Sequence, residues 1–214
     1  MKLIDSNKNI TRKTNMLFDK SAIKYGAGSD AVLWGNQQTQ YYRFAEIIKF
    51  IDVNGKNKRL LDVGCGNGEL YKFLNFMGFR GHYTGYDINQ NLINIAKERF
   101  KNIDVSIVDI MNLKAKKRFD YVVSSGLFNL NVGQGLRWTL RFIEKMYELC
   151  SEIMVFNMVS SHVNFKEKRM FYANPSVILS FCIEKLSPRV TLVHNNLPFN
   201  FTVSVFRDDK WNSV

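Results

Sequence analysis

A glycine-rich segment, RLLDVGCGNGEL at residues 59–70, constrains the fold of this chain more than any other part of the sequence. A short apolar run leads into Gly64, Gly66 and Gly68, and the stretch ELYKFLNFM, which has helical character, follows directly. Glycine allows a tight turn and lets a ligand approach bare backbone, which a Cβ atom would block. The start of the helix adds free N–H groups. The segment therefore predicts a strand, a turn suited to a nucleotide-like ligand, and a helix.

Polar residues stand at the ends of successive predicted strands. Asp62 lies at the end of the first strand, Asp87 ends the run HYTGYD, and Asp109 ends the run DVSIVD. The fourth strand, FDYVVSS, ends at Ser124 and Ser125. Open α/β sheets bind ligands at the carboxyl ends of their strands. An acid about 20 residues beyond the glycine turn, such as Asp87, can accept hydrogen bonds from ribose hydroxyls there. The alternative for Asp87 is that it only caps the following helix, since Asp is a good N-cap residue.

The spacing of the glycines separates two kinds of ligand. Gly64 and Gly66 satisfy the first two places of the dinucleotide fingerprint Gly-x-Gly-x-x-Gly, but the third place falls on Glu69. With Asp62 before the turn and Gly68 one residue early, the segment resembles motif I of the class I S-adenosylmethionine-dependent methyltransferases, acid-x-Gly-x-Gly-x-Gly. A nicotinamide-dependent enzyme stays open as a more distant alternative.

The resemblance implies S-adenosylmethionine as the cofactor, S-adenosylhomocysteine as its product, and no metal. It also implies that Asp109 bonds the adenine amino group and that the backbone N–H of Ile110 reaches the ring. We expect Arg43 to pair with the methionine carboxylate, because a guanidinium binds carboxylates bidentately; a solvent-facing arginine is the alternative. The predicted cofactor-binding residues are Asp62, Gly64, Cys65, Gly66, Gly68, Asp87, Ile88, Asp109, Ile110, Ser125, Arg43, Tyr25 and Trp34.

Strands and helices alternate along the rest of the chain, which implies a parallel sheet with helices on both faces. The last two strands, RVTLVHN and NFTVSVFR, are close enough in sequence to form an antiparallel hairpin. We predict an α/β, Rossmann-like, doubly wound sheet, and the resemblance implies seven strands. The other predicted strands are 59–63, 82–87, 104–109, 119–124 and 152–158, and the predicted helices after the turn are 68–77, 89–100, 133–150 and 174–186.

The domain organisation follows from the position of the glycine turn. Residues 1–36 form a polar lead-in that we expect to order over cofactor or substrate, with residues 1–20 disordered before a ligand binds. Residues 37–214 form a single methyltransferase domain, with a substrate-side insert at about 157–174.

The insert, VSSHVNFKEKRMFYANP, is rich in side chains that can bind an acceptor. We predict Asn164, Arg169 and Tyr172 as substrate-binding residues, although an ordinary solvated loop stays open. His162 and His194 are the candidate general bases, and His194 is preferred because it ends a strand near the expected acceptor side. A surface role is the alternative for each. In similar sequences an acid often follows the second histidine, whereas Asn follows it here. Methyltransferases that act on exocyclic amino groups of bases or on glutamine amides typically carry Asn-Pro-Pro-Tyr after the fourth strand. This chain reads SSGLFN there, so an N-methyltransferase of that type is not expected.

Composition narrows the remaining choices. The formal net charge of +11 invites a nucleic-acid partner, but the basic clusters at 56–59, 114–118 and 166–169 are short and scattered. The three cysteines lack metal-type spacing, and we expect them to be buried thiols. The N-terminus has no apolar secretory region, and no apolar run approaches the ~20 residues of a membrane helix, so we expect a cytoplasmic protein without a membrane partner.

The leading hypothesis is an O-methyltransferase acting on a small, sugar-like, polar or anionic metabolite. Much of the chain resembles a subgroup of small bacterial class I methyltransferases that often occur among polysaccharide or natural-product genes. An RNA methyltransferase and a non-catalytic cofactor-binding protein are the alternatives. The oligomeric state stays open.

Overall fold

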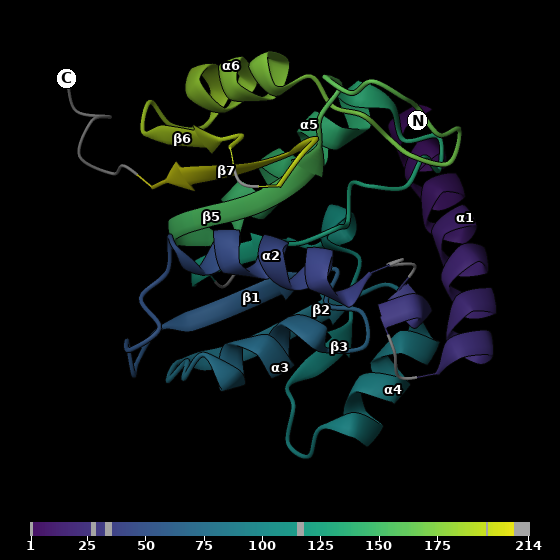
Figure 1. Ribbon diagram of the computed structural model, residues 1–214, viewed down its shortest axis with the longest axis vertical. Helices are drawn as coiled ribbons and strands as arrows, with labels where there is room; N and C mark the ends of the chain where they lie inside the picture. Colours follow the sequence, from purple (N-terminus) through teal and green to yellow (C-terminus); the bar gives the residue numbers. More distant parts are fainter. Residues whose placement is uncertain (1, 27–28, 33–35, 115–117, 196, 208–214) are drawn as a thin grey trace.

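The computed structural model describes residues 2–26, 29–32, 36–114, 118–195 and 197–207. These residues form a seven-stranded sheet in the order β3-β2-β1-β4-β5-β7-β6 (Figure 1). β1 to β5 pair in parallel, whereas β7 runs antiparallel to both β5 and β6. The predicted fold is therefore confirmed. The strands are β1 (Arg59–Val63), β2 (His82–Asp87), β3 (Val105–Ile107), β4 (Phe119–Ser124), β5 (Cys150–Val159), β6 (Val190–Val193) and β7 (Asn200–Phe206).

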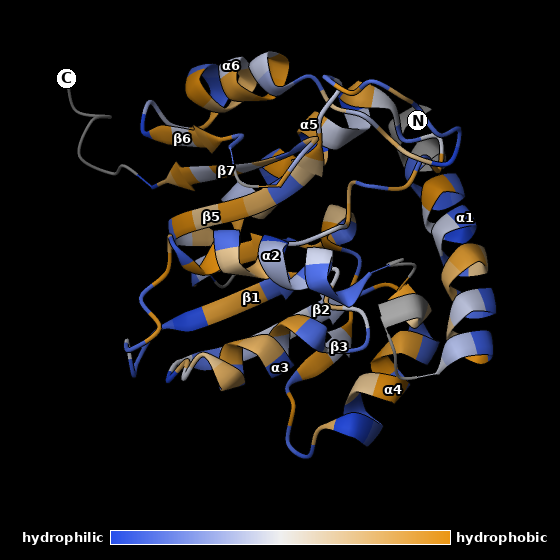
Figure 2. Ribbon diagram, viewed as in Figure 1, coloured by the Kyte–Doolittle hydropathy of each residue, from blue (hydrophilic) through white to orange (hydrophobic). Residues whose placement is uncertain are grey.

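Helices cover both faces of the sheet. Successive side chains of a strand point to opposite faces, so an apolar strand has residues to bury on each of them. Leu60 of β1 packs in the core formed with α2, α3 and α4, whereas Leu61 packs in the core formed with α5 and α6. Figure 2 shows β5 as a mostly hydrophobic band, as expected of a strand covered on both faces. The helices are α1 (Lys2–Tyr25), α2 (Gln37–Ile48), α3 (Glu69–Phe76), α4 (Gln90–Arg99), α5 (Gly135–Glu148) and α6 (Pro175–Lys185), with short 3-10 turns η1 (Ser29–Val32) and η2 (Ile110–Asn112).

The glycine turn lies where the strand order reverses. β1 lies between β2 and β4. After β1 the chain adds β2 and β3 on one side of this strand, and it then crosses over to add β4 and β5 on the other side. Crevices at such reversal points are the usual ligand sites of open α/β sheets. The topology thus places residues 64–68 at the expected ligand-binding edge.

The expectation of a disordered lead-in was wrong, because residues 2–25 form the helix α1. α1 lies along the edge at which the parallel strands end (Figure 1). Its buried side chains include Asn7, Ile10, Ser21 and Ala22. Two of these four are polar, so the inward face of α1 leaves only a weak apolar repeat in the sequence for periodicity to detect.

Two predicted boundaries also change. β3 ends at Ile107, and Asp109 instead caps η2, where its side chain accepts a hydrogen bond from the N–H of Met111. β5 runs to Val159, so the connection to α6 begins at Ser160 and not at residue 157. The three cysteines are buried free thiols, as predicted. The helices that the structure describes are each too short or too polar to cross a lipid bilayer.

Candidate active site

A cavity of about 140 Å³ lies at the carboxyl ends of β1, β2 and β4 and is covered by α1. Its floor is the glycine turn, and its roof includes Ile10, Thr14 and Phe18 of α1. Nine predicted cofactor-binding residues come together in the wall of this cavity. They are Asp62, Gly64, Cys65, Gly66, Asp87, Ile88, Asp109, Ile110 and Ser125.

Hydrogen bonds to β2 hold the glycine turn in place. The N–H groups of Gly64 and Cys65 both donate to the carbonyl oxygen of Tyr86, at 2.7 and 3.1 Å. Gly68 begins α3 in a left-handed conformation with a φ of 84°. This residue belongs to the turn but does not itself line the cavity. Its role is therefore to let the chain enter α3 directly, which brings the helix start against the site.

Asp87 organises the turn from the end of β2. Its Oδ2 accepts from the N–H of Gly66 at 2.8 Å, and its Oδ1 accepts from the N–H of Asn89 at 2.9 Å. Asn89, and not Asp87, is the N-cap of α4, since its side chain accepts from the N–H of Leu92. The simple capping alternative for Asp87 is therefore wrong. A carboxylate oxygen has more than one acceptor site, so Asp87 can still accept from a ligand.

Four carboxylates line the cavity: Asp62, Glu69, Asp87 and Asp109. Burial raises the pKa of Asp62 to about 7, and the nearby Asp87 adds to this, although the Tyr83 hydroxyl opposes it by donating to Asp62 Oδ2 at 2.8 Å. Burial also raises the pKa of Asp87, opposed by its backbone hydrogen bonds. Such a wall attracts a cationic ligand and repels a pyrophosphate. The electrostatics therefore favour a sulfonium cofactor over a dinucleotide.

The raised pKa of Asp62 makes stability depend on pH. Between the unfolded value of 3.8 and the folded value of about 7 the folded state binds more protons, so stability falls as pH rises through this range. In the parent protein this effect should lower the free energy of unfolding by up to about 4 kcal/mol between about pH 4 and pH 8. We expect urea titration of Asp62→Asn to show no such fall. Tyr83→Phe removes the opposing hydrogen bond, so it should extend the fall to higher pH. A fall of unchanged size in Asp62→Asn would contradict the assignment.

Asn7 of α1 reaches into the site from a distant part of the chain. Its Nδ2 donates to Asp109 Oδ2 at 2.8 Å, and its Oδ1 accepts from Trp138 Nε1 at 3.1 Å. Asp109 Oδ2 also accepts from the side chain of Asn112 at 3.0 Å. The sequence did not reveal Asn7 or Trp138 as site residues, because one lies in an unpatterned polar stretch and the other reads as an ordinary core aromatic.

Two other predicted cofactor residues, Tyr25 and Arg43, are not in the cavity wall. Tyr25 is exposed at the end of α1. Arg43 is buried within α2, and burial lowers its pKa to about 9, so its guanidinium stays charged at neutral pH. Its helix neighbours Gln40 and Phe44 line the cavity, but Arg43 does not. Trp34 lies outside the described residues. The roles of Arg43 and Tyr25 stay predictions.

The predicted acceptor residues lie on the insert after β5 and are not among the residues that line the cavity. The insert packs on the segment after β4, where the N–H of Phe171 donates to the carbonyl oxygen of Asn129 at 2.8 Å. Arg169 pairs with Glu167 at 2.9 Å, and the hydroxyl of Tyr172 accepts from the N–H of Glu167. Asn164 is exposed. These three residues stay predictions for acceptor binding.

The two candidate bases are both exposed. His162 follows β5 at the ligand-binding edge, and its N–H donates to Ser160 Oγ at 3.1 Å. His194 follows β6, which is separated from β5 by β7, so it lies roughly 10 Å across the sheet from β5. Position alone therefore favours His162 over His194 as the histidine nearer to the cavity, contrary to the preference from sequence, and a role as base stays a prediction for both. Within the described ranges, no group of three or more His, Cys, Asp or Glu side chains is arranged to hold a metal ion.

The fold and this site define a Rossmann-like domain with a glycine turn and an acidic pocket, the architecture of the class I methyltransferases. The family model described as "Methyltransferase domain" matches residues 54–185, more than half of the chain. The chain therefore belongs to the methyltransferase domain family, as the sequence predicted.

Individual relatives agree on the family and differ in acceptor. "Putative methyltransferase Rv1506c" of Mycobacterium tuberculosis (strain ATCC 25618 / H37Rv) is 29% identical over 154 residues, 67% of this chain and 90% of that protein. Magnesium protoporphyrin IX methyltransferase from Synechocystis PCC 6803, solved with bound S-adenosylmethionine, superposes with a TM-score of 0.66 at 16% identity, covering 93% of this chain and 97% of that one. The N-methyltransferase NodS from Bradyrhizobium japonicum WM9, solved with S-adenosylhomocysteine, gives a TM-score of 0.65 at 15% identity, covering 92% and 100%.

Proposed function

We propose that this protein binds S-adenosylmethionine in the cavity beneath α1 and transfers its methyl group to a small polar acceptor. The observation that carries the proposal is the set of four carboxylates in the cavity wall around a glycine turn: Asp62, Glu69, Asp87 and Asp109. A dinucleotide site also has an acid for the ribose at the end of the second strand, so Asp62 and Glu69 are the carboxylates that would repel a pyrophosphate at this turn. S-adenosylmethionine is cationic at its sulfonium, so the same wall stabilises it.

The cavity wall offers groups for two parts of the cofactor. The carboxylate of Asp87 would accept from the ribose hydroxyls, and Asp109 with the backbone of Ile110 would bind the adenine. S-adenosylmethionine supplies an electrophilic methyl group, and the chain contributes by holding donor and acceptor close and aligned. The hydrogen bonds that Asp87 accepts from the N–H groups of Gly66 and Asn89 support this role, because they hold the carboxylate in a single orientation.

The proposed acceptor is small, polar or anionic, and methylated on oxygen. The site is covered by α1, which leaves a confined space over the glycine turn. The segment after β4, SSGLFN, lacks the proline-rich clamp of many enzymes that methylate exocyclic amines and amides. His162 or His194 would serve as the base for a hydroxyl acceptor, and Asn164, Arg169 and Tyr172 would bind its polar groups.

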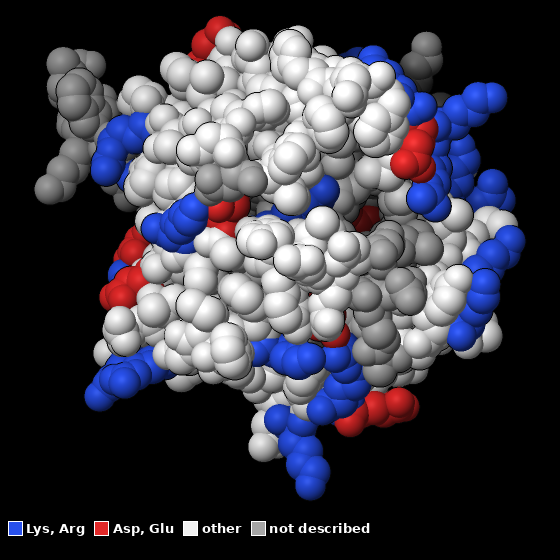
Figure 3. All heavy atoms as spheres, viewed as in Figure 1, with Lys and Arg blue, Asp and Glu red and all other residues white. Residues whose placement is uncertain are grey.

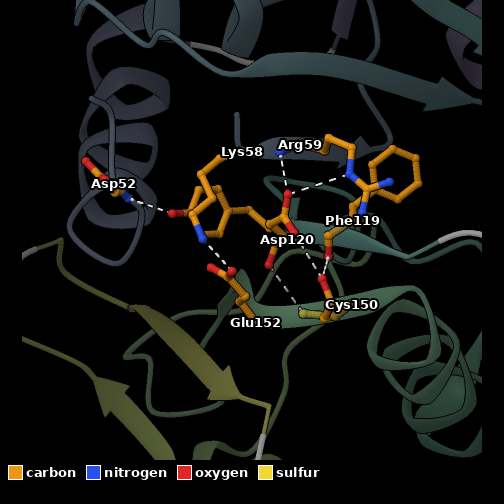
Figure 4. Close-up of polar contacts among 9 residues, drawn as sticks. Asp52, Lys58, Arg59, Phe119, Asp120, Cys150 and Glu152 are labelled. Carbon is orange, nitrogen blue, oxygen red and sulfur yellow. Dashed lines mark hydrogen bonds and ion pairs between the residues drawn. The ribbon is translucent and has the colours of Figure 1, made fainter. Parts of the chain in front are cut away.

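The basic surface gives less support to an RNA acceptor. Figure 3 shows Lys and Arg spread around the rim of the visible face with acidic side chains among them. The cluster at 56–59 lies at the opposite edge of the sheet from the cavity, at the start of β1. There Lys58 pairs with Glu152 and Arg59 pairs with Asp120 (Figure 4). Lys58 and Arg59 thus form ion pairs between neighbouring strands, and they do not lie beside the cavity.

The first experiment measures thermal unfolding with S-adenosylhomocysteine and, separately, with NADH. A ligand at about 100 times its Kd adds about 2.7 kcal/mol, which raises the Tm of a domain this size by about 5–10 °C. We expect this rise with S-adenosylhomocysteine and none with NADH. The reverse result would overturn the proposal.

The second experiment follows transfer of a radiolabelled methyl group. We expect label to enter a pool of hydroxylated sugars and sugar acids and not a pool of tRNA and rRNA fragments. Transfer to RNA, with an affinity that falls steeply with salt, would favour the RNA alternative. Cofactor binding without transfer to any acceptor class would favour the non-catalytic alternative.

A further inference from the structure

Two buried oxygen atoms in the cavity wall have no hydrogen-bond partner among the described residues: Gln40 Oε1 and Glu69 Oε2. Both residues are only 3% exposed, and both line the cavity. They come from different helices, α2 and α3, which contact each other. A buried acceptor without a donor is costly, so native structures rarely keep one unless a ligand or water completes it.

Arg99 fixes the orientation of Glu69. Its Nη2 pairs with Glu69 Oε1, and its Nη1 donates to the carbonyl oxygen of Asn67 at 2.8 Å. One carboxylate oxygen is therefore engaged behind the turn, which leaves Oε2 as the unpartnered one. The resulting pair of acceptors, one from a carboxylate and one from an amide, suits a ligand group that donates several hydrogen bonds and carries positive charge. An ammonium group is that kind of ligand.

The strand order shows which end of the cofactor would meet this pair. Asp109 follows β3, Asp87 ends β2, and Glu69 follows the turn after β1. The three strands are neighbours in this order, so Asp87 lies between the other two along the edge of the sheet. Adenine, ribose and the amino-acid tail of an adenosyl sulfonium follow each other in the same order. The tail would thus lie at the Glu69 end.

We propose that Gln40 Oε1 and Glu69 Oε2 form a subsite for the ammonium group of the amino-acid tail of S-adenosylmethionine. This inference rests on the proposed function. Neither residue carries a motif signal in the sequence, and Glu69 enters the sequence argument only as the place where the dinucleotide fingerprint lacks its glycine.

The test compares two ligands by calorimetry: S-adenosylhomocysteine, which has the amino-acid tail, and 5′-methylthioadenosine, which lacks it. We expect Gln40→Leu to weaken binding of S-adenosylhomocysteine about 10-fold, and Glu69→Gln to weaken it about 10- to 100-fold, because bonds to charged groups are the stronger ones. Binding of 5′-methylthioadenosine should change less than about 2-fold in both variants. Gln40→Glu keeps the acceptor, so it should retain or increase the affinity for S-adenosylhomocysteine.

Ser204→Ala is the matched control. Ser204 Oγ is also buried without a partner among the described residues, but it lies on β7, away from the cavity. Its removal should leave the affinity for both ligands unchanged. Glu69→Gln also alters the pair with Arg99, so its melting temperature is measured alongside, and Gln40→Leu tests the subsite with that pair intact.

Equal losses for both ligands, or no loss for either, would overturn the subsite and leave the proposed function standing. A parent protein that binds neither ligand would overturn the proposed function and the subsite together. A loss confined to the ligand with the tail supports both.

Discussion

Asp87→Ala is expected to reduce the affinity for S-adenosylhomocysteine at least 100-fold. The substitution removes the acceptor for the ribose hydroxyls and also frees the N–H groups of Gly66 and Asn89, which now donate to it at 2.8 and 2.9 Å. Hydrogen bonds to a charged group contribute about 1.5–3 kcal/mol each, so losing two from the ligand exceeds a factor of 100. Calorimetry measures the affinity, and circular dichroism confirms that the variant is folded at the temperature used.

Asp104→Ala is the matched control for this prediction. Asp104 directly precedes β3 and does not line the cavity, and its side chain accepts a hydrogen bond from Thr84 Oγ1 of β2 at 2.8 Å. It should leave the affinity unchanged. If Asp87→Ala bound S-adenosylhomocysteine as tightly as Asp104→Ala does, the assignment of Asp87 to the ribose would be wrong.

Gly66→Ala is expected to lower both the affinity for S-adenosylhomocysteine and the free energy of unfolding. Gly66 has a φ of +54°, and a Cβ atom there would lie 2.9 Å from Val32 Cγ1. Val32 belongs to η1 and lines the cavity, so the added methyl group pushes the cover of the site away. The left-handed backbone costs about 1–2 kcal/mol, and overpacking adds about 1–3 kcal/mol. Urea titration should therefore show a loss of about 2–5 kcal/mol.

Gly26→Ala separates the two contributions. Gly26 has a φ of +61°, but nothing lies within 4 Å of the added Cβ atom. It should lose about 1–2 kcal/mol and keep its affinity for S-adenosylhomocysteine. Equal losses in the two variants would show that the contact with Val32 contributes nothing.

The centre of the sheet could be predicted from the sequence because local signals and topology agree there. The bounds of β1, β2 and β4 match the prediction, since apolar runs, a glycine turn and polar strand ends all mark the same residues. The polar residues at these ends then had to share one edge of the sheet. The structure brings Asp62 and Asp87 into one cavity wall, together with Asp109, which follows β3.

The cover of the site could not be predicted in the same way. α1 packs through a face that includes Asn7 and Ser21, and buried polar side chains weaken the hydrophobic period. The acceptor pair of Gln40 and Glu69 also leaves no pattern, because each residue reads as an ordinary member of its helix. Such residues are recognised only when the three-dimensional structure shows which oxygens lack partners.

The bond from Asn7 to Asp109 has a consequence for ligand entry. The side-chain amide of Asn7 presents to this carboxylate the same kind of NH₂ donor that adenine carries. An arriving adenine would thus replace the NH₂ group of Asn7 by its own NH₂ group as the donor to Asp109. The exchange would add little net affinity, but it would favour adenine over bases that lack this donor. Because the amide belongs to α1, this exchange would break one hydrogen bond that holds the roof to the site. We expect the observed association rate, followed by stopped-flow fluorescence, to level off at high ligand concentration at the rate of this opening, and Asn7→Ala to raise that limit. A rate that rises linearly throughout would mean that the roof does not gate entry.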